Sequence, residues 1–227
     1  MRAQSPSPLK AAPARSGALR CLALCLLCLS LLGCGISRPT DFYLLDGTSD
    51  PLSVPHMPRT TLTVEQIVLP GYLDRSGIVI RDDGGSGLNV ASFNVWGEPL
   101  EQGVHRVLVN MLTAPLLQHG ITVLPYQSAN FGIWYHLYVE VLRLDADRSG
   151  RVVLEARWTL VDRTGNKVLD RGSFAAEERL NMPEFGSDSM FNAVVGAESR
   201  LLQQMGRDLA ERLCAVAKPA AALSDAK

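Results

Sequence analysis

Three consecutive segments in which polar and apolar residues alternate constrain the fold more than any other feature of this sequence. They span residues 134–146, 151–161 and about 167–175. Alternation with period two, interrupted by short polar turns, predicts an antiparallel meander with one face against a core and one face in water. Glu155, Arg157 and Thr159 are expected on the water face. The apolar face of such a meander needs a second layer of secondary structure to cover it.

Two segments with helical periodicity can supply that layer. The first opens at residues 96–100, and we expect Pro115 to kink or end it, with His119 and Gly120 as the final stop. Its apolar face comprises Leu100, Val104, Val107, Leu108, Met111 and Leu112. The second helix is the longest element, residues 189–216. Its apolar stripe comprises Met190, Val194, Ala197, Leu201, Met205 and Leu209.

Shorter apolar segments complete the element order. They are residues 61–64 with 67–69, then 78–81, 88–93 and 121–124. Strands therefore run together in two groups, each followed by a helix. This order predicts an α+β domain, with a mostly antiparallel sheet and the two helices packed on one face.

The N-terminal region has the pattern of an export signal. Four basic residues and no acidic ones precede an apolar run, residues 21–32, which is too short to span a bilayer. The run ends in Leu31-Leu32-Gly33-Cys34, which resembles the bacterial lipobox, where the cysteine sulfur takes a diacylglycerol and the freed amine is acylated. We therefore expect residues 1–33 to be a lipoprotein signal peptide and Cys34 to carry the lipid.

The remaining chain is expected to form a tether, one domain and a tail. Residues 34–59 are rich in Pro, Ser, Thr and Asp and are expected to be a flexible tether. Within the tether, residues 42–45 are apolar enough to dock on the domain or on a partner; the alternative is a pure linker, and both remain open. We expect a single domain over residues 60–217 and a loose tail over 218–227.

Charge and cysteine content limit what the mature chain can do. Four of the 22 Lys and Arg residues lie in the leader, which leaves 18 basic and 23 acidic residues and a net charge of −5. The absence of a basic stripe argues against nucleic acid as a partner. After removal of the leader and lipidation of Cys34, Cys214 is the one remaining cysteine, so no intramolecular disulfide can form. A structural thiol is the expected role of Cys214.

Residues suited to catalysis do not gather in the sequence. The four histidines lack zinc-ligand spacing, and no serine lies in a Gly-x-Ser-x-Gly setting. The glycine-rich stretch 82–87 precedes a strand, as a hairpin turn does, and lacks the Gly-Lys-Ser/Thr ending of a phosphate loop. Asp145 and Asp147 are expected to be ordinary charges at a hairpin end. We expect no catalytic, cofactor or metal site, and no enzymatic activity.

The segment 72–75 has the properties of a partner-binding loop. Tyr72, Leu73, Asp74 and Arg75 combine an aromatic ring, an apolar side chain and two charges after a Pro-Gly turn. Loops on a rigid scaffold concentrate binding residues, and Tyr and Arg are favoured interface anchors. The alternative is that Tyr72 and Leu73 pack inward while Asp74 and Arg75 pair locally.

Several short motifs together resemble one known family. They are Leu69-Pro70-Gly71-Tyr72-Leu73-Asp74-Arg75 with Ile78-Val79, Trp96-x-Glu98-Pro99-Leu100, His105-Arg106-Val107-Leu108, and Ala156-x-Trp158-x-Leu160-x-Asp162. In this order, after a lipobox, they resemble the ABC-type transport auxiliary lipoprotein family (PqiC-like), over about residues 42–214. Gly71 departs from the family pattern, where this position varies.

The resemblance implies a non-catalytic lipoprotein of the outer membrane that faces the periplasm. It also implies an MCE-domain partner anchored in the inner membrane, a separate ATPase subunit, and transport of lipids or other hydrophobic molecules. Gly35, directly after Cys34, fits the pattern of lipoproteins exported to the outer membrane. The oligomeric state stays open, a homo-oligomer included.

Two other functions remain as alternatives to this adaptor. A periplasmic carrier would hold a hydrophobic ligand in a cavity between helices and sheet. An envelope hydrolase would require the fold to gather histidines and carboxylates in one cleft.

Overall fold

The computed structural model describes residues 38–47, 60–82, 86–126 and 132–216. The chain divides into two compact units, Met1–Pro39 and Thr40–Lys227, and the elements below belong to the second. The predicted signal peptide, Cys34 and the predicted tail, residues 218–227, lie outside the described residues, as does most of the predicted tether.

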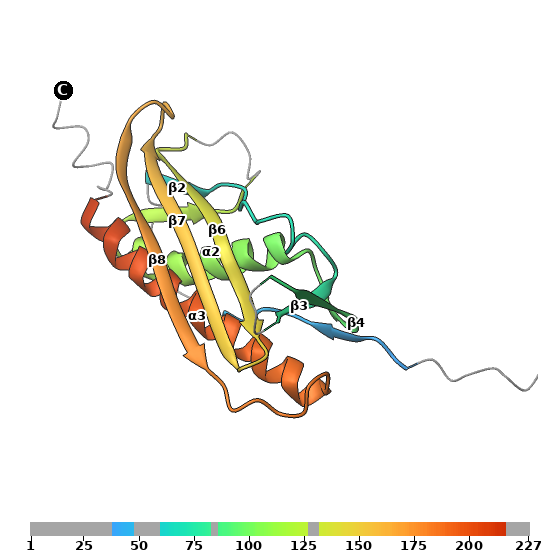
Figure 1. Cartoon of the computed structure of the whole chain (residues 1–227). Coiled ribbons are helices and arrows are strands. Elements are labelled where there is room, and N and C mark those ends of the chain that lie inside the picture. Colours follow the sequence, from blue (N-terminus) through green and yellow to red (C-terminus); the bar gives the residue numbers. More distant parts are fainter. Residues whose placement is uncertain (1–37, 48–59, 83–85, 127–131, 217–227) are drawn as a thin grey trace, which may run out of the picture. The chain divides into compact units, whose positions relative to one another are not determined.

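One eight-stranded sheet and two helices make up the described part of the fold (Figure 1). In chain order the elements are β1 (Asp41–Tyr43), β2 (Thr60–Val64), β3 (Gly77–Arg81), β4 (Leu88–Trp96), α2 (Leu100–Gln118), β5 (Ile121–Leu124), β6 (Tyr135–Asp147), β7 (Arg151–Asp162), β8 (Val168–Arg179) and α3 (Asp188–Val216).

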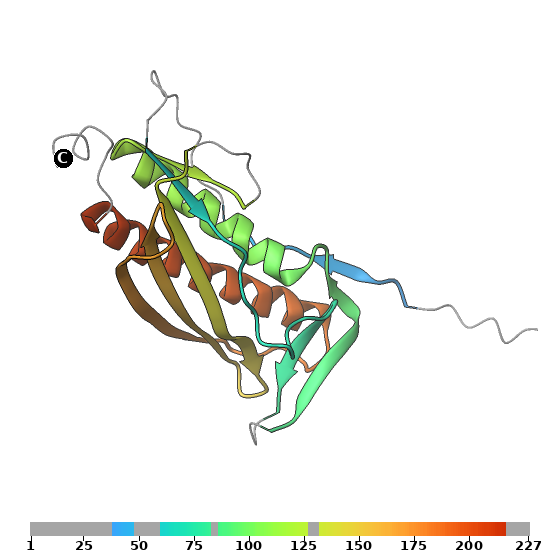
Figure 2. The same cartoon turned by 90° about the horizontal axis from the view of Figure 1, so that it is seen from above.

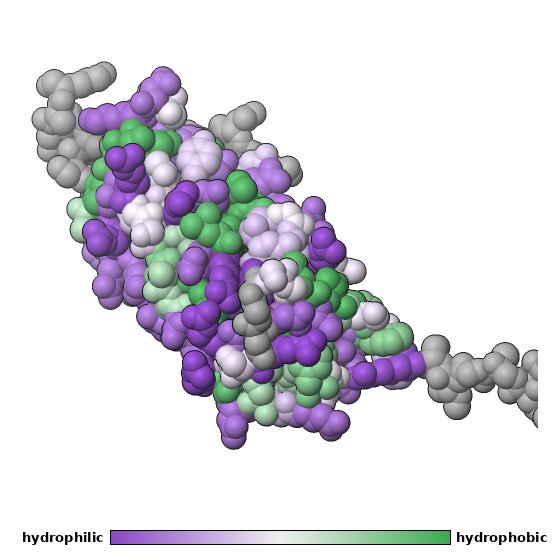
Figure 3. Space-filling model, in the orientation of Figure 1, coloured by the Kyte–Doolittle hydropathy of each residue, from purple (hydrophilic) through white to green (hydrophobic). Residues whose placement is uncertain are grey.

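Strands β6, β7 and β8 form the predicted antiparallel meander and pair along most of their length. Glu155 and Arg157 are exposed on its outer face, as expected, and Thr159 is half-buried. Seen from that side, the surface mixes hydrophilic and hydrophobic residues (Figure 3). The meander supplies the longest ladders of the sheet, so the prediction of a mostly antiparallel α+β fold is confirmed.

The remaining strands include parallel pairs that the sequence analysis did not predict. The other edge of β6 is long enough for two partners: β2 pairs in parallel with residues 135–137, and β3 pairs in parallel with residues 146 and 147. β2 also pairs in parallel with β5, and β1 with β4, whereas β3 and β4 form an antiparallel hairpin. Parallel pairing joins segments far apart in sequence, and the pattern of a single strand does not identify such a partner.

Both helices lie on one face of the sheet and pack against each other, as predicted (Figures 1 and 2). α2 contacts β5 and β2, and α3 contacts β7 and β8. Pro115 lies inside α2 and does not end it. The helix ends after Gln118, and Gly120 takes a φ of 76° that glycine adopts readily. Neither α2 nor α3 is long and apolar enough to cross a membrane.

Cys214 lies on the side of α3 that meets α2. Its Sγ is 3.9 Å from the carbonyl oxygen of Pro115, and its side chain is half-buried. Burial raises the pKa of this thiol. Such a thiol is less reactive than an exposed one, in keeping with the structural role expected for it.

Residues 41–47 belong with the sheet, although they fall inside the predicted tether. β1 pairs with β4, and Tyr43 and Leu45 are buried in the core. The backbone N–H of Asp46 donates to Ser199 Oγ on α3 (2.9 Å), and Gln203 Nε2 donates to the Asp46 carbonyl (3.1 Å). Residues 42–45 are therefore not a pure linker, because Tyr43 and Leu45 dock on the domain while Phe42 and Leu44 stay exposed.

Candidate functional site

The loop that connects β2 to β3 runs along the edge of β6, in the space between its two parallel partners. Val68 forms an isolated parallel bridge with Glu140. Its N–H donates to the Val139 carbonyl (3.1 Å), and its carbonyl accepts from the Val141 N–H (2.8 Å). The following residues form a turn, in which the Leu73 N–H donates to the Pro70 carbonyl (2.9 Å). The loop predicted to bind a partner is therefore fixed at its start by backbone hydrogen bonds.

A buried charge network holds the middle of this loop. The Tyr72 hydroxyl donates to Asp145 Oδ2 (2.6 Å), and the Asp145 side chain is fully buried. Arg81 donates to both oxygens of that carboxylate, from Nε (3.2 Å) and Nη2 (2.8 Å), and Arg143 Nε donates to Oδ1 (2.9 Å). The Arg81 guanidinium also lies over the Tyr72 ring, 5.1 Å from its centroid. The network ties the loop to β3 and β6 at once.

The protonation states in this network are set by burial and by its hydrogen bonds. Burial alone raises the pKa of Asp145, but hydrogen bonds from Arg81, Tyr72 and Arg143 outweigh it, so the pKa of Asp145 is lowered. Burial and the hydrogen bond to Asp145 both raise the pKa of the Tyr72 hydroxyl. At neutral pH Asp145 is therefore ionised and Tyr72 keeps the proton that it donates.

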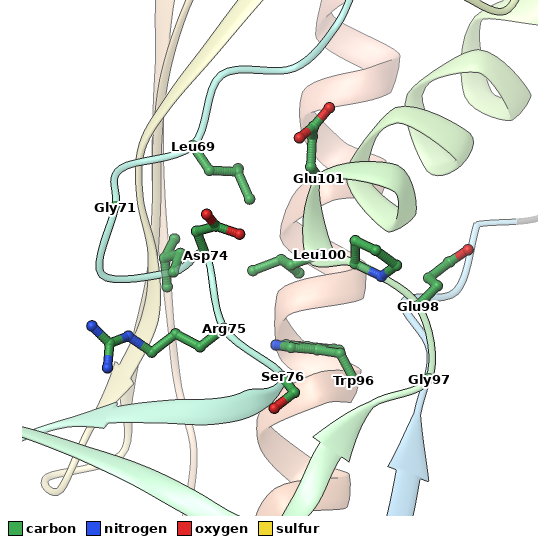
Figure 4. Close-up of a pocket in the computed structure, with 12 residues that line it drawn as sticks. Leu69, Gly71, Asp74, Arg75, Ser76, Trp96, Gly97, Glu98, Leu100 and Glu101 are labelled. Carbon is green, nitrogen blue, oxygen red and sulfur yellow. The ribbon is translucent and has the colours of Figure 1, made fainter.

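Beside the loop, a cleft of about 510 Å³ lies between residues 69–76 and the segment that opens α2 (Figure 4). Three of its apolar side chains, those of Leu73, Trp96 and Leu100, are each less than a tenth exposed, and Leu69 and Pro99 also line it. Four charged residues, Asp74, Arg75, Glu98 and Glu101, line the rest of it. In Figure 4 the Asp74 carboxylate points toward the start of α2, whereas the Arg75 side chain extends away from it.

The charge balance of this cleft is acidic. Glu98 is neutralised by Arg106, whose Nη2 lies 2.6 Å from Glu98 Oε1. Among the described residues, neither Asp74 nor Glu101 forms a salt bridge. An apolar floor with carboxylates at the rim suits a basic side chain, because its methylene stem packs below while its charged group meets the rim.

The four predicted loop residues divide into two inward and two outward side chains. Leu73 is buried in the core and Tyr72 is half-buried on Asp145, as the inward alternative holds. Asp74 and Arg75 are exposed. Arg75 Nε donates to the Tyr72 carbonyl (3.0 Å) rather than to Asp74. The partner-binding role of these residues stays a prediction.

The network under the loop was not predicted from the sequence. Asp145 was expected to be an ordinary charge at a hairpin end, and that interpretation is wrong because its side chain is fully buried in the network. Its partners Tyr72 and Arg81 lie 73 and 64 residues away in the sequence, so the local pattern around the hairpin does not reveal them. Residues 96–100 were recognised as a motif in the sequence, but their position beside residues 72–75 in space was not predicted.

Side chains fill the region in which a carrier would hold its ligand. Leu108, Leu112 and Leu116 of α2 are fully buried, as are Leu137 of β6 and Leu154 and Leu160 of β7. Close packing of this kind leaves few voids larger than a water molecule. Among the described residues, no group of three His, Cys, Asp or Glu side chains could hold a metal ion.

A comparison with known protein families shows to which family this chain belongs. The model of a family described as "ABC-type transport auxiliary lipoprotein component" matches residues 43–210. The chain belongs to this family. The match covers every described strand and helix except the first two residues of β1 and the end of α3. It confirms the resemblance found in the sequence motifs.

Crystal structures with the same fold agree with this assignment. One, described only as an uncharacterized protein, has a TM-score of 0.62 and 22% sequence identity, and the match covers 78% of this chain and 99% of that one. Protein XCC0632 from Xanthomonas campestris has a TM-score of 0.58 and 18% identity, with 77% and 95% covered. At these identities the likeness shows the fold alone. No curated protein matches the chain by sequence.

Proposed function

We propose that this auxiliary lipoprotein is a non-catalytic adaptor that docks an MCE-domain protein of the inner membrane. Cys34 anchors it to the outer membrane, and its domain faces the periplasm. The transported cargo is a lipid or another hydrophobic molecule, and a separate subunit supplies the ATPase. The observation that carries the proposal is an exposed pair of charges, Asp74 and Arg75, on a loop that a buried network holds beside an acidic cleft.

The geometry of the loop favours docking of a protein over chemistry on a substrate. The titratable groups under the loop hold one another in fixed protonation states, and the two arginines bind a carboxylate rather than a ligand. A loop already fixed in its bound conformation loses little entropy when a partner arrives. We infer that a Lys or Arg of the partner enters the cleft between Asp74 and Glu101.

Affinity capture of the full-length, lipidated protein from envelopes of the source bacterium tests the proposal. The test variant is Asp74→Ala with Arg75→Ala. The matched control is Asp170→Ala with Arg171→Ala, because the same Asp-Arg dipeptide recurs on β8. Mass spectrometry identifies co-purified proteins and the modification of Cys34. Membrane flotation of Cys34→Ala tests the anchor.

We expect an MCE-domain protein with wild type and with the control variant, and loss of most of it with the test variant. Removal of an interface anchor typically weakens binding by about 2 kcal/mol or more, which is a factor of about 30. Failure of the wild-type protein to retain an MCE-domain protein would refute the adaptor function. Equal retention by both double variants would refute the loop as its docking site.

A further inference from the structure

Exposed apolar side chains of the described residues concentrate on two neighbouring strands. Ten large hydrophobic residues are exposed in the described ranges, and five of them lie on or directly beside β1 and β4. These are Phe42 (72% exposed), Leu44 (57%), Leu88 (39%), Val90 (37%) and Phe93 (41%). Scattered single hydrophobic residues are normal on a protein surface, whereas a contiguous group marks an interaction site.

The strand register puts these five side chains on one face of the sheet. On β3, Gly77, Val79 and Arg81 alternate to the same side, and their partners on β4 are Val95, Val90 and Leu88. Paired residues of neighbouring strands share a face, so Leu88 and Val90 lie on the same side as Val95. β4 is irregular between Val90 and Val95. Both residues still lie on the same side, because their partners Val79 and Gly77 do.

Phe42, Leu44 and Phe93 join them on that side. Phe42 pairs with Val95, Leu44 follows it by two residues, and Phe93 precedes Val95 by two. The opposite side of the same strands meets α3: Tyr43 packs against Phe191, and Asn94 Nδ2 donates to Asp188 Oδ1 (3.2 Å). We call the group of five the outer apolar face.

This face also carries little charge, because the one charged residue of β3 on its side, Arg81, is paired with the buried Asp145. None of the nine residues of β4 is Asp, Glu, Lys or Arg, although most of the strand is exposed. β1 has one charged residue, Asp41, whose position in the alternation places it on the same side as Tyr43. β1 is also the last strand at its end of the sheet, so no described strand covers its far edge.

The length of chain before β1 limits how far this face can lie from the expected lipid anchor. Cys34 is seven residues before Asp41. A fully extended chain advances at most about 3.6 Å per residue, so a lipid on Cys34 lies within about 25 Å of β1. The outer apolar face, which includes Phe42 of β1, thus stays near the bilayer that holds the lipid. A tethered contact of this kind forms at high effective concentration, so a few inserted side chains suffice.

We propose that the outer apolar face lies on the lipid surface of the membrane that holds Cys34. This inference rests on the anchoring of Cys34 in the proposed function. Phe42 and Phe93 enter the boundary between headgroups and acyl chains, as apolar residues of interfacial segments do. Trp96, which lines the cleft, follows Phe93 by three residues on β4, or about 10 Å. The membrane contact therefore fixes the height of the cleft above the bilayer.

Spin labels on the lipidated, full-length protein test this contact. In a Cys214→Ser background, single cysteines at Phe42 and Phe93 carry nitroxides, and Val168, exposed at the start of β8, is the control position. The protein is reconstituted into vesicles of phosphatidylethanolamine with a minority of phosphatidylglycerol. The accessibility of each label to oxygen and to a water-soluble nickel complex is compared in detergent and in vesicles. Thermal melts confirm that each labelled protein is folded.

On reconstitution, the labels at 42 and 93 are expected to gain oxygen accessibility and lose nickel accessibility, while the label at 168 does not change. If the protein does not float with the vesicles, the anchor fails and the inference fails with it. If it floats but the three labels behave alike, the inference alone is overturned. Spin–spin broadening that disappears on dilution with unlabelled protein shows a second copy on this face, and also overturns it.

Discussion

The buried carboxylate of Asp145 helps to fix the position of the exposed loop at residues 70–75. Its two oxygens accept four hydrogen bonds, from Tyr72, Arg81 and Arg143. Removal of one partner from a buried, charged acceptor costs more than removal of a pair between neutral groups. The position of the loop therefore depends on Asp145 and on the three side chains that donate to it.

Tyr72→Phe tests this dependence, because it deletes the hydroxyl and leaves the ring. We expect the free energy of unfolding to fall by about 1.5–3 kcal/mol, the range for hydrogen bonds to charged groups. Denaturant unfolding measures the change. Asp74→Ala is the control on the same loop, and its exposed side chain should change the free energy by no more than about 0.5 kcal/mol. Equal effects of the two substitutions would show that the network does not hold the loop.

The buried Glu198 of α3 is expected to make the free energy of unfolding depend on pH. Its side chain is 1% exposed, and Oε2 meets no hydrogen-bond partner among the described residues. Burial, and then the negative charge of Asp145, raise the pKa of Glu198 well above its usual value. The folded protein therefore keeps a proton that the unfolded chain releases above about pH 4.3, and the free energy of unfolding falls by about 1.4 kcal/mol per pH unit up to the raised pKa.

Glu198→Gln removes this pH-dependent loss, and the variant should become more stable than wild type as pH rises above about 4.3. Asp145 acts in the opposite direction, because its pKa is lowered and its contribution is lost as pH falls through that value. Denaturant unfolding at a series of pH values separates the two. Glu211→Gln, at an exposed position of α3, is the control. Parallel profiles for wild type and Glu198→Gln would contradict the assignment.

At the scale of elements, one glycine sets how closely α2 and α3 approach. A Cβ on Gly206 of α3 would lie 2.6 Å from Met111 Cβ of α2, closer than two such atoms can pack. A Cβ on Gly196 of the same helix would meet only the end of the Arg200 side chain, at 3.3 Å. The two positions share a helix and differ in what faces them.

The same substitution is therefore expected to have opposite effects at the two positions. Gly206→Ala should lower the free energy of unfolding by about 1–3 kcal/mol, because the methyl group forces the helices apart. Gly196→Ala should raise it by up to about 1 kcal/mol through helix propensity. Denaturant unfolding of both variants tests the pair. Stabilisation by Gly206→Ala would contradict the close approach.

The helices and strands were predicted well from local patterns. The periodicity of apolar residues and the residue types of a turn can both be read from neighbouring residues. The long helix was placed at residues 189–216, and α3 spans Asp188–Val216. Partners across the sheet were harder to predict: β2 pairs with both β5 and β6, and a five-residue apolar strand fits either neighbour. The burial of Asp145 was missed for the same reason, since Tyr72 and Arg81, which pair with it, come from segments far away in the sequence.

At the scale of the whole molecule, the cleft forms where two distant motifs meet. Residues 69–76 reach it along the edge of β6, and residues 96–101 reach it from the end of β4. Each motif was visible in the sequence, but their contact depends on the path of the loop between two parallel strands. The account therefore predicts that a partner contacts the loop and the start of α2 together.

Site-specific photo-crosslinking in living cells tests this central claim most directly. A photo-crosslinking amino acid replaces Asp74 in the full-length protein, and Arg171 on β8 is replaced in a matched control. Adducts are isolated after irradiation and identified by mass spectrometry. The account predicts an adduct with an MCE-domain protein from position 74 and none from position 171. No adduct with such a protein from position 74, or equal adducts from both positions, would contradict it.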